Sequence, residues 1–413
     1  MGDVLVIGTM DTKGQEVGFL VDTLTKAGAT WRVINIGVFE PDHSDVPVAV
    51  TPTELASLAG ADINELRRGG EQGGTRSLAL DAMAAGLEVV LRREYEAGTL
   101  GAVLGFGGSS GSSVIGRAIQ ALPVGVPKVL VSTMASGDVT PYVGTRDVTL
   151  MYSVTDIAGL NRISRVVLRN AAMAAAGMAR GMEEDETSEP DRPLIAISMF
   201  GVTTPAVMAV QKALDQRDLE TTVFHATGAG GRAMEDLVRD GLIDAVVDLT
   251  TSELTDELVG GVLSAGPDRM EAAGLAGIPQ VLVPGALEVI NFGAEPTVPQ
   301  QFRVPERRVH VHNSAVTICR TNLDESRELG RIFTRKANLA TGPTMVVLPL
   351  AGLSAIGAPG QPYEDREADE ALFNEIRTGL REDIPLVEVD AAINDPAFAA
   401  RVVEVFDQLW AQR

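Results

Sequence analysis

The chain has 413 residues, of which 45% are hydrophobic, and it carries a formal net charge of −22. This length exceeds one ordinary core and predicts two or three domains. The acidity, without any basic stripe, excludes nucleic acid as a nonspecific partner. A single cysteine, Cys319, excludes an intrachain disulfide framework and a multi-cysteine metal site. No apolar run reaches the ~18–20 residues that span a bilayer, and no signal peptide precedes the first strand, so we expect a cytoplasmic protein without a membrane partner.

The first segments predict a βαβ unit. Val4–Ile7 reads as a buried strand, Gly8–Gly14 as a polar turn, Glu16–Ala27 as an amphipathic helix and Trp31–Ile36 as the next strand. Residues 40–77, rich in glycine and polar residues, read as an excursion from the sheet. Alternation of β-branched runs with helices predicts a parallel sheet with helices on both faces.

The same alternation continues and then begins again after an acidic, proline-bounded segment, 187–193. We therefore expect an N-terminal α/β domain (1–186), a linker (187–193) and a C-terminal α/β domain (194–413), both Rossmann-like. In the first domain the further expected elements are helix Ser77–Glu96, strand Gly101–Leu104, helix Ser112–Ala121, strand Val129–Ser132 and helix Ile157–Met182. The matching layout of the two halves fits either an internal duplication or ordinary α/β regularity.

The stretch Gly105–Ser113 is the first candidate site, because eight of its nine residues are glycine or serine. Glycines let the backbone approach a ligand, and the amides and dipole at a helix start attract an anion. The stretch lacks the Gly-Lys-Ser/Thr of a Walker A loop and the third glycine of a dinucleotide fingerprint. It predicts a phosphate site, with a tight turn of small residues as the alternative. The candidate contacts are Gly107, Gly108, Ser109, Ser110, Gly111 and Ser112.

The segment Gly8–Gly14 is the second candidate, with Asp11, Thr12 and Lys13 after the first strand. Ligands of open α/β sheets bind beyond the carboxyl ends of the strands, so this segment and Gly105–Ser113 should share one edge. Lys13 would supply the positive charge that the glycine-serine stretch lacks. Asp11 would reach a Mg²⁺ ion or a sugar hydroxyl. The alternative is a solvated turn.

Small and hydroxylated residues also follow strands in the second half, and they predict the opposite wall of a cleft between the domains. Arg232 there would grip an oxyanion in a bidentate manner, and a surface salt bridge is its alternative role. The candidate contacts are Thr203, Thr204, Gly228, Gly230, Gly231 and Arg232.

A metal site is the weaker interpretation of the His310-Val-His312 alternation. Both histidines would lie on one face of a strand, and Glu288 would be the further ligand. No third ligand has diagnostic spacing, so a structural role is the alternative and no metal is assigned. Cys319 lies in an apolar run that favours an inert buried thiol.

The order of these motifs resembles the Tm-1-like ATP-binding family over essentially the whole chain. The matching stretches are Gly8–Gly14, Gly105–Ser113, Ser198–Pro205, Ala226–Glu235 and Asn291–Gly293. The resemblance implies a two-domain α/β protein that binds ATP and forms a homodimer, without a settled reaction. It also implies a member without the additional C-terminal, barrel-like region of the plant proteins.

The combined expectation is a nucleotide-binding protein that holds ATP, with or without Mg²⁺, in a cleft between its domains. An enzyme that activates a small metabolite fits this expectation. A small-molecule sensor without turnover is one alternative, and a metal-dependent hydrolase that uses His310, His312 and Glu288 is another.

Overall fold

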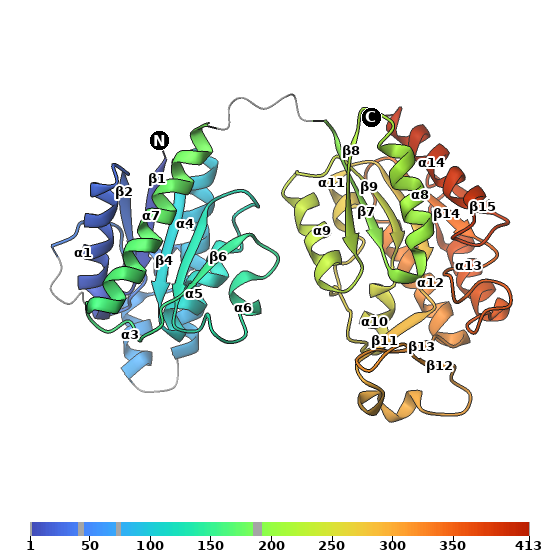
Figure 1. Cartoon of the computed structure of the whole chain (residues 1–413), viewed down its shortest axis with the longest axis horizontal. Coiled ribbons are helices and arrows are strands. Elements are labelled where there is room, and N and C mark those ends of the chain that lie inside the picture. The colour runs from blue at the N-terminus through green and yellow to red at the C-terminus, as the bar shows by residue number, and fades with distance from the viewer. Residues whose placement is uncertain (1, 40–44, 72–75, 185–191, 413) are drawn as a thin grey trace. The chain divides into compact units, whose positions relative to one another are not determined.

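The computed structural model describes residues 2–39, 45–71, 76–184 and 192–412. The chain divides into two compact units, Met1–Glu189 and Pro190–Arg413. Each unit is an α/β layer structure with its own six-stranded parallel sheet (Figure 1), which confirms the predicted fold class. Of the predicted linker, residues 187–191 lie outside the described residues, as do 40–44 and 72–75 of the predicted excursion.

The N-terminal sheet has the strand order β3-β2-β1-β4-β5-β6. Its strands are β1 (Asp3–Gly8), β2 (Trp31–Asn35), β3 (Val48–Val50), β4 (Leu100–Gly107), β5 (Lys128–Ser132) and β6 (Val148–Tyr152). From β1 the chain moves outward to β2, and from β4 it moves outward to β5 on the other side. The carboxyl ends of β1 and β4 therefore form the topological switch point, where open α/β sheets bind ligands.

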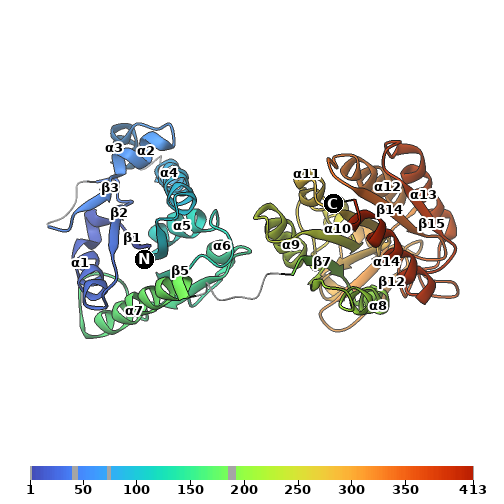
Figure 2. The ribbon, with the colours of Figure 1, turned by 90° about the horizontal axis from the view of Figure 1, so that it is seen from above.

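Helices cover both faces of this sheet, because both faces of its central strands are apolar. Val4 and Val6 face α1 (Met10–Lys26) and α7 (Arg162–Glu184). Leu5 and Ile7 face the opposite layer, which contains α4 (Arg76–Glu96) and α5 (Ser109–Ile119). Figure 2 shows these helices around the sheet. The remaining helices of the unit are α2 (Pro52–Leu58), α3 (Ile63–Glu71) and α6 (Thr140–Val143).

Two segments predicted to be turns belong largely to helices, and those predictions were wrong in extent. Helix α1 already begins at Met10, with a local departure from helical geometry at Lys13 (φ −136°, ψ 27°). Helix α5 begins at Ser109 rather than at Ser112, and β4 continues through Gly107. Small polar residues are common in and before the first helical turn, because the amides there have no intrahelical acceptor and polar side chains can accept from them. Composition alone therefore overstated the length of both turns.

The C-terminal sheet has the order β15-β14-β10-β9-β7-β8, in which the chain moves outward from β7 to β8 and, on the other side, from β9 through β10 and β14 to β15. Its strands are β7 (Leu194–Met199), β8 (Glu220–His225), β9 (Ala245–Thr250), β10 (Gln280–Gly285), β14 (Thr344–Pro349) and β15 (Leu386–Val389). Its helices are α8 (Thr204–Leu214), α9 (Ala229–Arg239), α10 (Glu253–Val259), α11 (Ala272–Ala276), α12 (Leu323–Ala337), α13 (Arg366–Gly379) and α14 (Pro396–Trp410). A small antiparallel sheet, β11-β13-β12, is added by Val289–Phe292, Thr317–Arg320 and Val309–Val311.

Helices also cover both faces of the C-terminal sheet. Helices α8 and α14 share a core with the sheet on one face, and α12 and α13 share a core with it on the other. Among the described helices, none combines the length and the apolar character needed to cross a bilayer.

Candidate functional site

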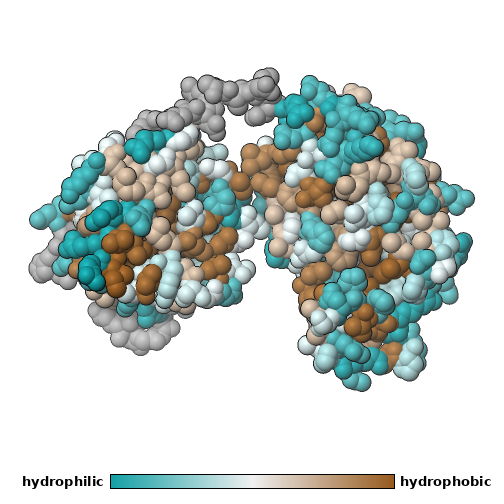
Figure 3. Space-filling view, viewed as in Figure 1, coloured by the Kyte–Doolittle hydropathy of each residue, from teal (hydrophilic) through white to brown (hydrophobic). Residues whose placement is uncertain are grey.

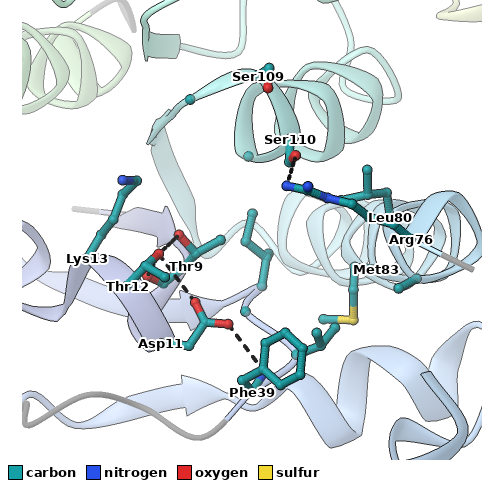
Figure 4. Close-up of a pocket in the computed structure, with 16 residues that line it drawn as sticks. Thr9, Asp11, Thr12, Lys13, Phe39, Arg76, Leu80, Met83, Ser109 and Ser110 are labelled. Atoms are coloured by element: carbon teal, nitrogen blue, oxygen red, sulfur yellow. Dashed lines mark hydrogen bonds between the residues drawn. The ribbon is translucent and has the colours of Figure 1, made fainter. Parts of the chain in front are cut away.

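A pocket of about 520 Å³ lies at the switch point of the N-terminal unit (Figure 4). Four segments line it: the start of α1, the residues after β2, the start of α4 and the start of α5. Its polar lining is Thr9, Asp11, Thr12, Lys13, Arg76, Ser109 and Ser110. Its apolar lining is Ile36, Val38, Phe39, Ala79, Leu80 and Met83, and glycines 37, 108 and 111 complete it. The pocket thus has a polar wall, from α1 and α5, and a mainly apolar wall, from α4 and the residues after β2, which also carries Arg76 (Figure 4).

The start of α5 supplies the part of the pocket best suited to an anion. Gly108 is the N-cap residue and has no side chain to cap the helix, while its carbonyl accepts from the Ser112 amide at 2.9 Å. The first amides of a helix have no intrahelical acceptor, and the helix dipole adds positive potential there. A phosphate or carboxylate at Ser109 and Ser110 would therefore meet amides, hydroxyls and a favourable field.

Arg76 reaches this helix start from α4. Its Nη2 donates to the Ser110 hydroxyl oxygen at 2.9 Å, and Figure 4 shows the guanidinium extending toward α5. Sequence analysis did not single out Arg76, because it lay at the end of the glycine-rich stretch read as an excursion. The sequence signal was limited to an arginine immediately before the predicted helix Ser77–Glu96.

Lys13 lines the pocket at the side opposite Arg76 (Figure 4). Its ammonium donates to the Ile157 carbonyl oxygen, which ties the start of α1 to the segment before α7. The predicted cation is therefore at the predicted edge, and it is engaged with the backbone. Together, Lys13 and Arg76 place positive charge on both sides of the α5 start.

Asp11 lies between the polar and apolar walls. Its carboxylate accepts from the Phe39 amide at 3.3 Å and from the Thr12 hydroxyl at 3.4 Å. Burial raises the pKa of Asp11, and these two hydrogen bonds and the charge of Lys13 oppose the rise. Gly37 is needed for this contact, since an added Cβ would lie 2.6 Å from the Asp11 carboxyl group.

Asn35 fixes the relative positions of these segments. At the end of β2, its buried Oδ1 accepts from the Met10 amide at 3.1 Å and from the Gly37 amide at 2.9 Å. One side chain thereby joins the start of α1 to the segment that carries the apolar wall.

Two predicted contacts, Gly107 and Ser112, are placed behind the pocket rather than in its lining. The buried Ser112 hydroxyl bonds to the Ser132 hydroxyl at 2.7 Å and donates to the Gly107 carbonyl at 3.2 Å. An added Cβ on Gly107 would lie 3.1 Å from the Gly111 Cα. These residues hold α5 against the sheet and so position Gly108 to Gly111.

Thr203 and Thr204 in the C-terminal unit have internal partners. The buried Thr203 hydroxyl accepts from the Phe200 amide at 3.1 Å and bonds to the Thr250 hydroxyl at 2.7 Å. The Thr204 hydroxyl donates to the Gly201 carbonyl at 3.1 Å. Both hydroxyls organise the start of α8, and their contact with a ligand stays a prediction.

A carboxylate of the protein itself occupies the start of α9. Glu253 Oε1 accepts from the Gly228 amide at 2.7 Å and from the Gly231 amide at 3.1 Å. An added Cβ on Gly231 would lie 2.1 Å from that carboxylate, and one on Gly230 would lie 2.0 Å from the His225 carbonyl oxygen. The glycines of this segment therefore serve close internal packing, and ligand binding by them stays a prediction.

The fully buried Arg269 balances that carboxylate. Its Nε donates to Glu253 at 2.6 Å, and its two terminal nitrogens donate to Asp248 at 2.5 and 2.7 Å. Arg232, the predicted oxyanion contact, donates to the Ser264 carbonyl at 2.8 Å, and its contact with a ligand stays a prediction. Arg269 and the amides of Gly228 and Gly231 therefore hold the Glu253 carboxylate at the start of α9.

The residues of the metal interpretation are not assembled. His310 and His312 are exposed, whereas Glu288 is buried and accepts from the Ser354 hydroxyl. Burial raises the pKa of Glu288, and it raises the pKa of the buried Cys319 to about 11, as expected for an inert thiol. No group of three metal-ligating side chains occurs within residues 2–39, 45–71, 76–184 and 192–412.

The two parallel sheets, one with a ligand-sized pocket at its switch point, define a two-domain Rossmann-like α/β protein. Residues 2–184 and 192–410 match the N-terminal and C-terminal domains of the Uncharacterised protein family (UPF0261), and the chain belongs to this family.

Its relatives include bacterial and plant proteins. A UPF0261 protein of Clostridium tetani is 43% identical over 397 residues, which cover 96% of each chain. The ToMV resistance protein Tm-1(GCR237) of Solanum lycopersicum is 39% identical over 419 residues, which cover 98% of this chain and 55% of the tomato protein. The expected relationship to Tm-1 is thus confirmed, while ATP binding stays a prediction. A putative UDP-N-acetylglucosamine 2-epimerase from Listeria monocytogenes aligns at 12% identity with a TM-score of 0.21, which is too low to support an inference.

Proposed function

We propose that the N-terminal unit binds a nucleotide, ATP in the first instance, in the switch-point pocket. The observation that carries the proposal is a polar wall that contains the uncapped start of α5 and Lys13, with Arg76 reaching Ser110 from the opposite, mainly apolar wall. Phosphate oxygens suit the first wall, since amides, hydroxyls and cations are their usual partners. The base suits the second wall, where Phe39 and Met83 offer apolar surface.

Asp11 lies where such a ligand would pass from one wall to the other. A ribose hydroxyl would donate to its carboxylate, or Mg²⁺ would bridge it to the phosphates. A comparison of ATP with 2′-deoxy-ATP, each with and without Mg²⁺, separates these two roles. The proposed contacts of Thr203, Thr204 and residues 228–232 with the same ligand form a separate hypothesis, because these residues already have internal partners.

Isothermal titration calorimetry with Mg-ATP tests the proposal directly. Wild-type protein should bind with a stoichiometry of one per chain, and Gly108→Val, which fills the pocket beside the start of α5, should lower the affinity at least about tenfold. Absence of binding by ATP, ADP and AMP at millimolar concentration would overturn the proposal. Phosphate release assayed with a panel of small acids then separates an ATP-dependent enzyme from a sensor that binds without turnover.

A further inference from the structure

The segment between β6 and α7, residues 153–161, is held to the start of α1 by two side chains. The Lys13 ammonium donates to the Ile157 carbonyl oxygen, and the buried Glu16 carboxylate accepts from the Gly159 amide at 2.7 Å. Lys13 and Glu16 are three positions apart and therefore reach the segment from the same side of α1. Because Lys13 also lines the switch-point pocket, one of the two contacts belongs to a pocket residue.

The backbone of this segment has a conformation that its own residues do not favour. Val154 has a φ of 67°, a left-handed value that a β-branched residue rarely adopts, and its side chain is 58% exposed, so packing does not enforce that value. The Thr155 hydroxyl is buried and has no hydrogen-bond partner among the described residues. Such a conformation persists only where other contacts hold it. Weakening the contact with Lys13 or with Glu16 therefore favours a different arrangement of the segment.

Solvent already borders much of this segment. Val154, Asp156 and Ala158 are exposed, whereas the Ile157 side chain is buried in the core that α1 and α7 share. Polar and apolar side chains are mixed on the face of the unit that carries α7, where the segment ends (Figure 3). Water can therefore hydrate the backbone groups that a movement of the segment exposes, and the main cost of that movement is the exposure of Ile157.

We propose that a nucleotide in the switch-point pocket releases residues 153–161 from α1, because its phosphates draw Lys13 away from the Ile157 carbonyl. The release rests on the proposed function, since it requires phosphates beside Lys13. A charged phosphate attracts an ammonium more strongly than a neutral carbonyl does. The four-carbon stem of lysine is flexible and lets the ammonium change acceptor without a movement of α1. Arg76 needs no such change, because its partner Ser110 already lies at the start of α5.

Nucleotide should thus have opposite effects on two neighbouring parts of the unit. A ligand shifts a segment between two states only if it favours one of them. Here the phosphates favour the state in which the Ile157 carbonyl has lost Lys13. The pocket should become more rigid on binding while residues 153–161 become less protected, a combination that simple coverage by a ligand does not produce.

Hydrogen–deuterium exchange of the full chain measures this effect. With Mg-ATP at a concentration that calorimetry shows to be saturating, amides of residues 153–161 should exchange roughly tenfold faster than without nucleotide, because the segment has lost a charge-assisted hydrogen bond. Binding without faster exchange there would overturn the proposed release and leave the nucleotide site standing. Absence of binding would overturn both. Faster exchange with adenosine, which has no phosphate, would refute the role of charge.

Replacement of Lys13 by methionine tests the link without any ligand. Lys13→Met removes the charge and keeps much of the side-chain length, so residues 153–161 should exchange about as fast without nucleotide as those of wild-type protein do with it. Mg-ATP should then cause no further increase. Lys26→Met, at the exposed other lysine of α1, is the matched control and should behave as wild type. Slow exchange of the segment in Lys13→Met would overturn the proposal.

Reciprocity gives a second test, since a loosened segment should raise the affinity of the pocket. Glu16→Ala removes the contact with Gly159, and Glu16 is not among the residues that line the pocket. This variant should lower the Kd for Mg-ATP about fivefold or more, whereas general damage to α1 would raise the Kd. Calorimetry that gives an unchanged or higher Kd would overturn the coupling between the pocket and the segment.

Discussion

Replacement of Arg76 by alanine should weaken nucleotide binding while leaving the fold intact. Arg76 is exposed and makes a 2.9 Å hydrogen bond with Ser110. Loss of such a surface contact changes the free energy of unfolding by roughly 0.5 kcal/mol or less. The same guanidinium lies beside the proposed phosphate position, where a charge-assisted hydrogen bond contributes about 1.5–3 kcal/mol.

That energy corresponds to an increase in Kd of about 10- to 150-fold, since 1.4 kcal/mol is a factor of ten. Calorimetry with Mg-ATP measures the Kd, and urea denaturation measures the stability of the same samples. Arg92→Ala is the matched control, because Arg92 lies on the same helix and its partner is Glu88 at 3.1 Å. Equal losses of affinity in the two variants, or an unchanged Kd in Arg76→Ala, would refute the assignment of Arg76 to the ligand.

Three further predictions concern the two units separately. Gly108→Val should lower affinity for Mg-ATP at least about tenfold, with little change in melting temperature, since an added Cβ would meet nothing closer than 3.9 Å; a large loss of stability would contradict this. Glu253→Ala should lower the free energy of unfolding in urea by about 3–5 kcal/mol, because it leaves three buried donors, the Gly228 amide, the Gly231 amide and the Arg269 Nε, without their acceptor, and an unchanged urea midpoint would show that these contacts are not stabilising. Burial raises the pKa of Asp256 and of Asp369 to about 7 from an ordinary value of 3.8. The folded state therefore retains protons that the unfolded state loses, and stability should fall between pH 5 and pH 7 by up to about 1.4 kcal/mol per pH unit for each group; a rise over this interval would contradict the assignment.

The edge that carries the pocket was predictable from the sequence, whereas the local geometry of that edge was not. Runs of apolar residues located β1 and β4. Because the carboxyl ends of parallel strands lie at one edge of the sheet, Gly8–Gly14 and Gly105–Ser113 were then expected to lie together. Glycine and serine content does not distinguish an open loop from the first turn of a helix, because both residue types suit each. The helix starts at Met10 and Ser109 were therefore missed.

Contacts between distant residues explain the other differences. Arg76 reaches Ser110 only because α4 packs beside α5, and no local pattern encodes that packing. In the C-terminal unit, the glycines around residue 230 have the same composition as a ligand-binding segment. Their partner, Glu253, follows a different strand, and its approach to Gly228 depends on the fold of the whole sheet.

The position of Glu253 has a consequence for how each unit responds to small molecules. A carboxylate attached to the chain acts as a tethered ligand, and dilution does not remove it. The start of α9 is therefore saturated at every protein concentration, and added anions gain little by competing there. Among the described residues no side chain caps the start of α5, so the occupancy of the proposed site there would follow the free concentration of the nucleotide. At 100 times the Kd, linkage adds about 2.7 kcal/mol to the stability of the state that binds. Nucleotide should consequently raise the thermal transition of the N-terminal unit and leave that of the C-terminal unit where it was.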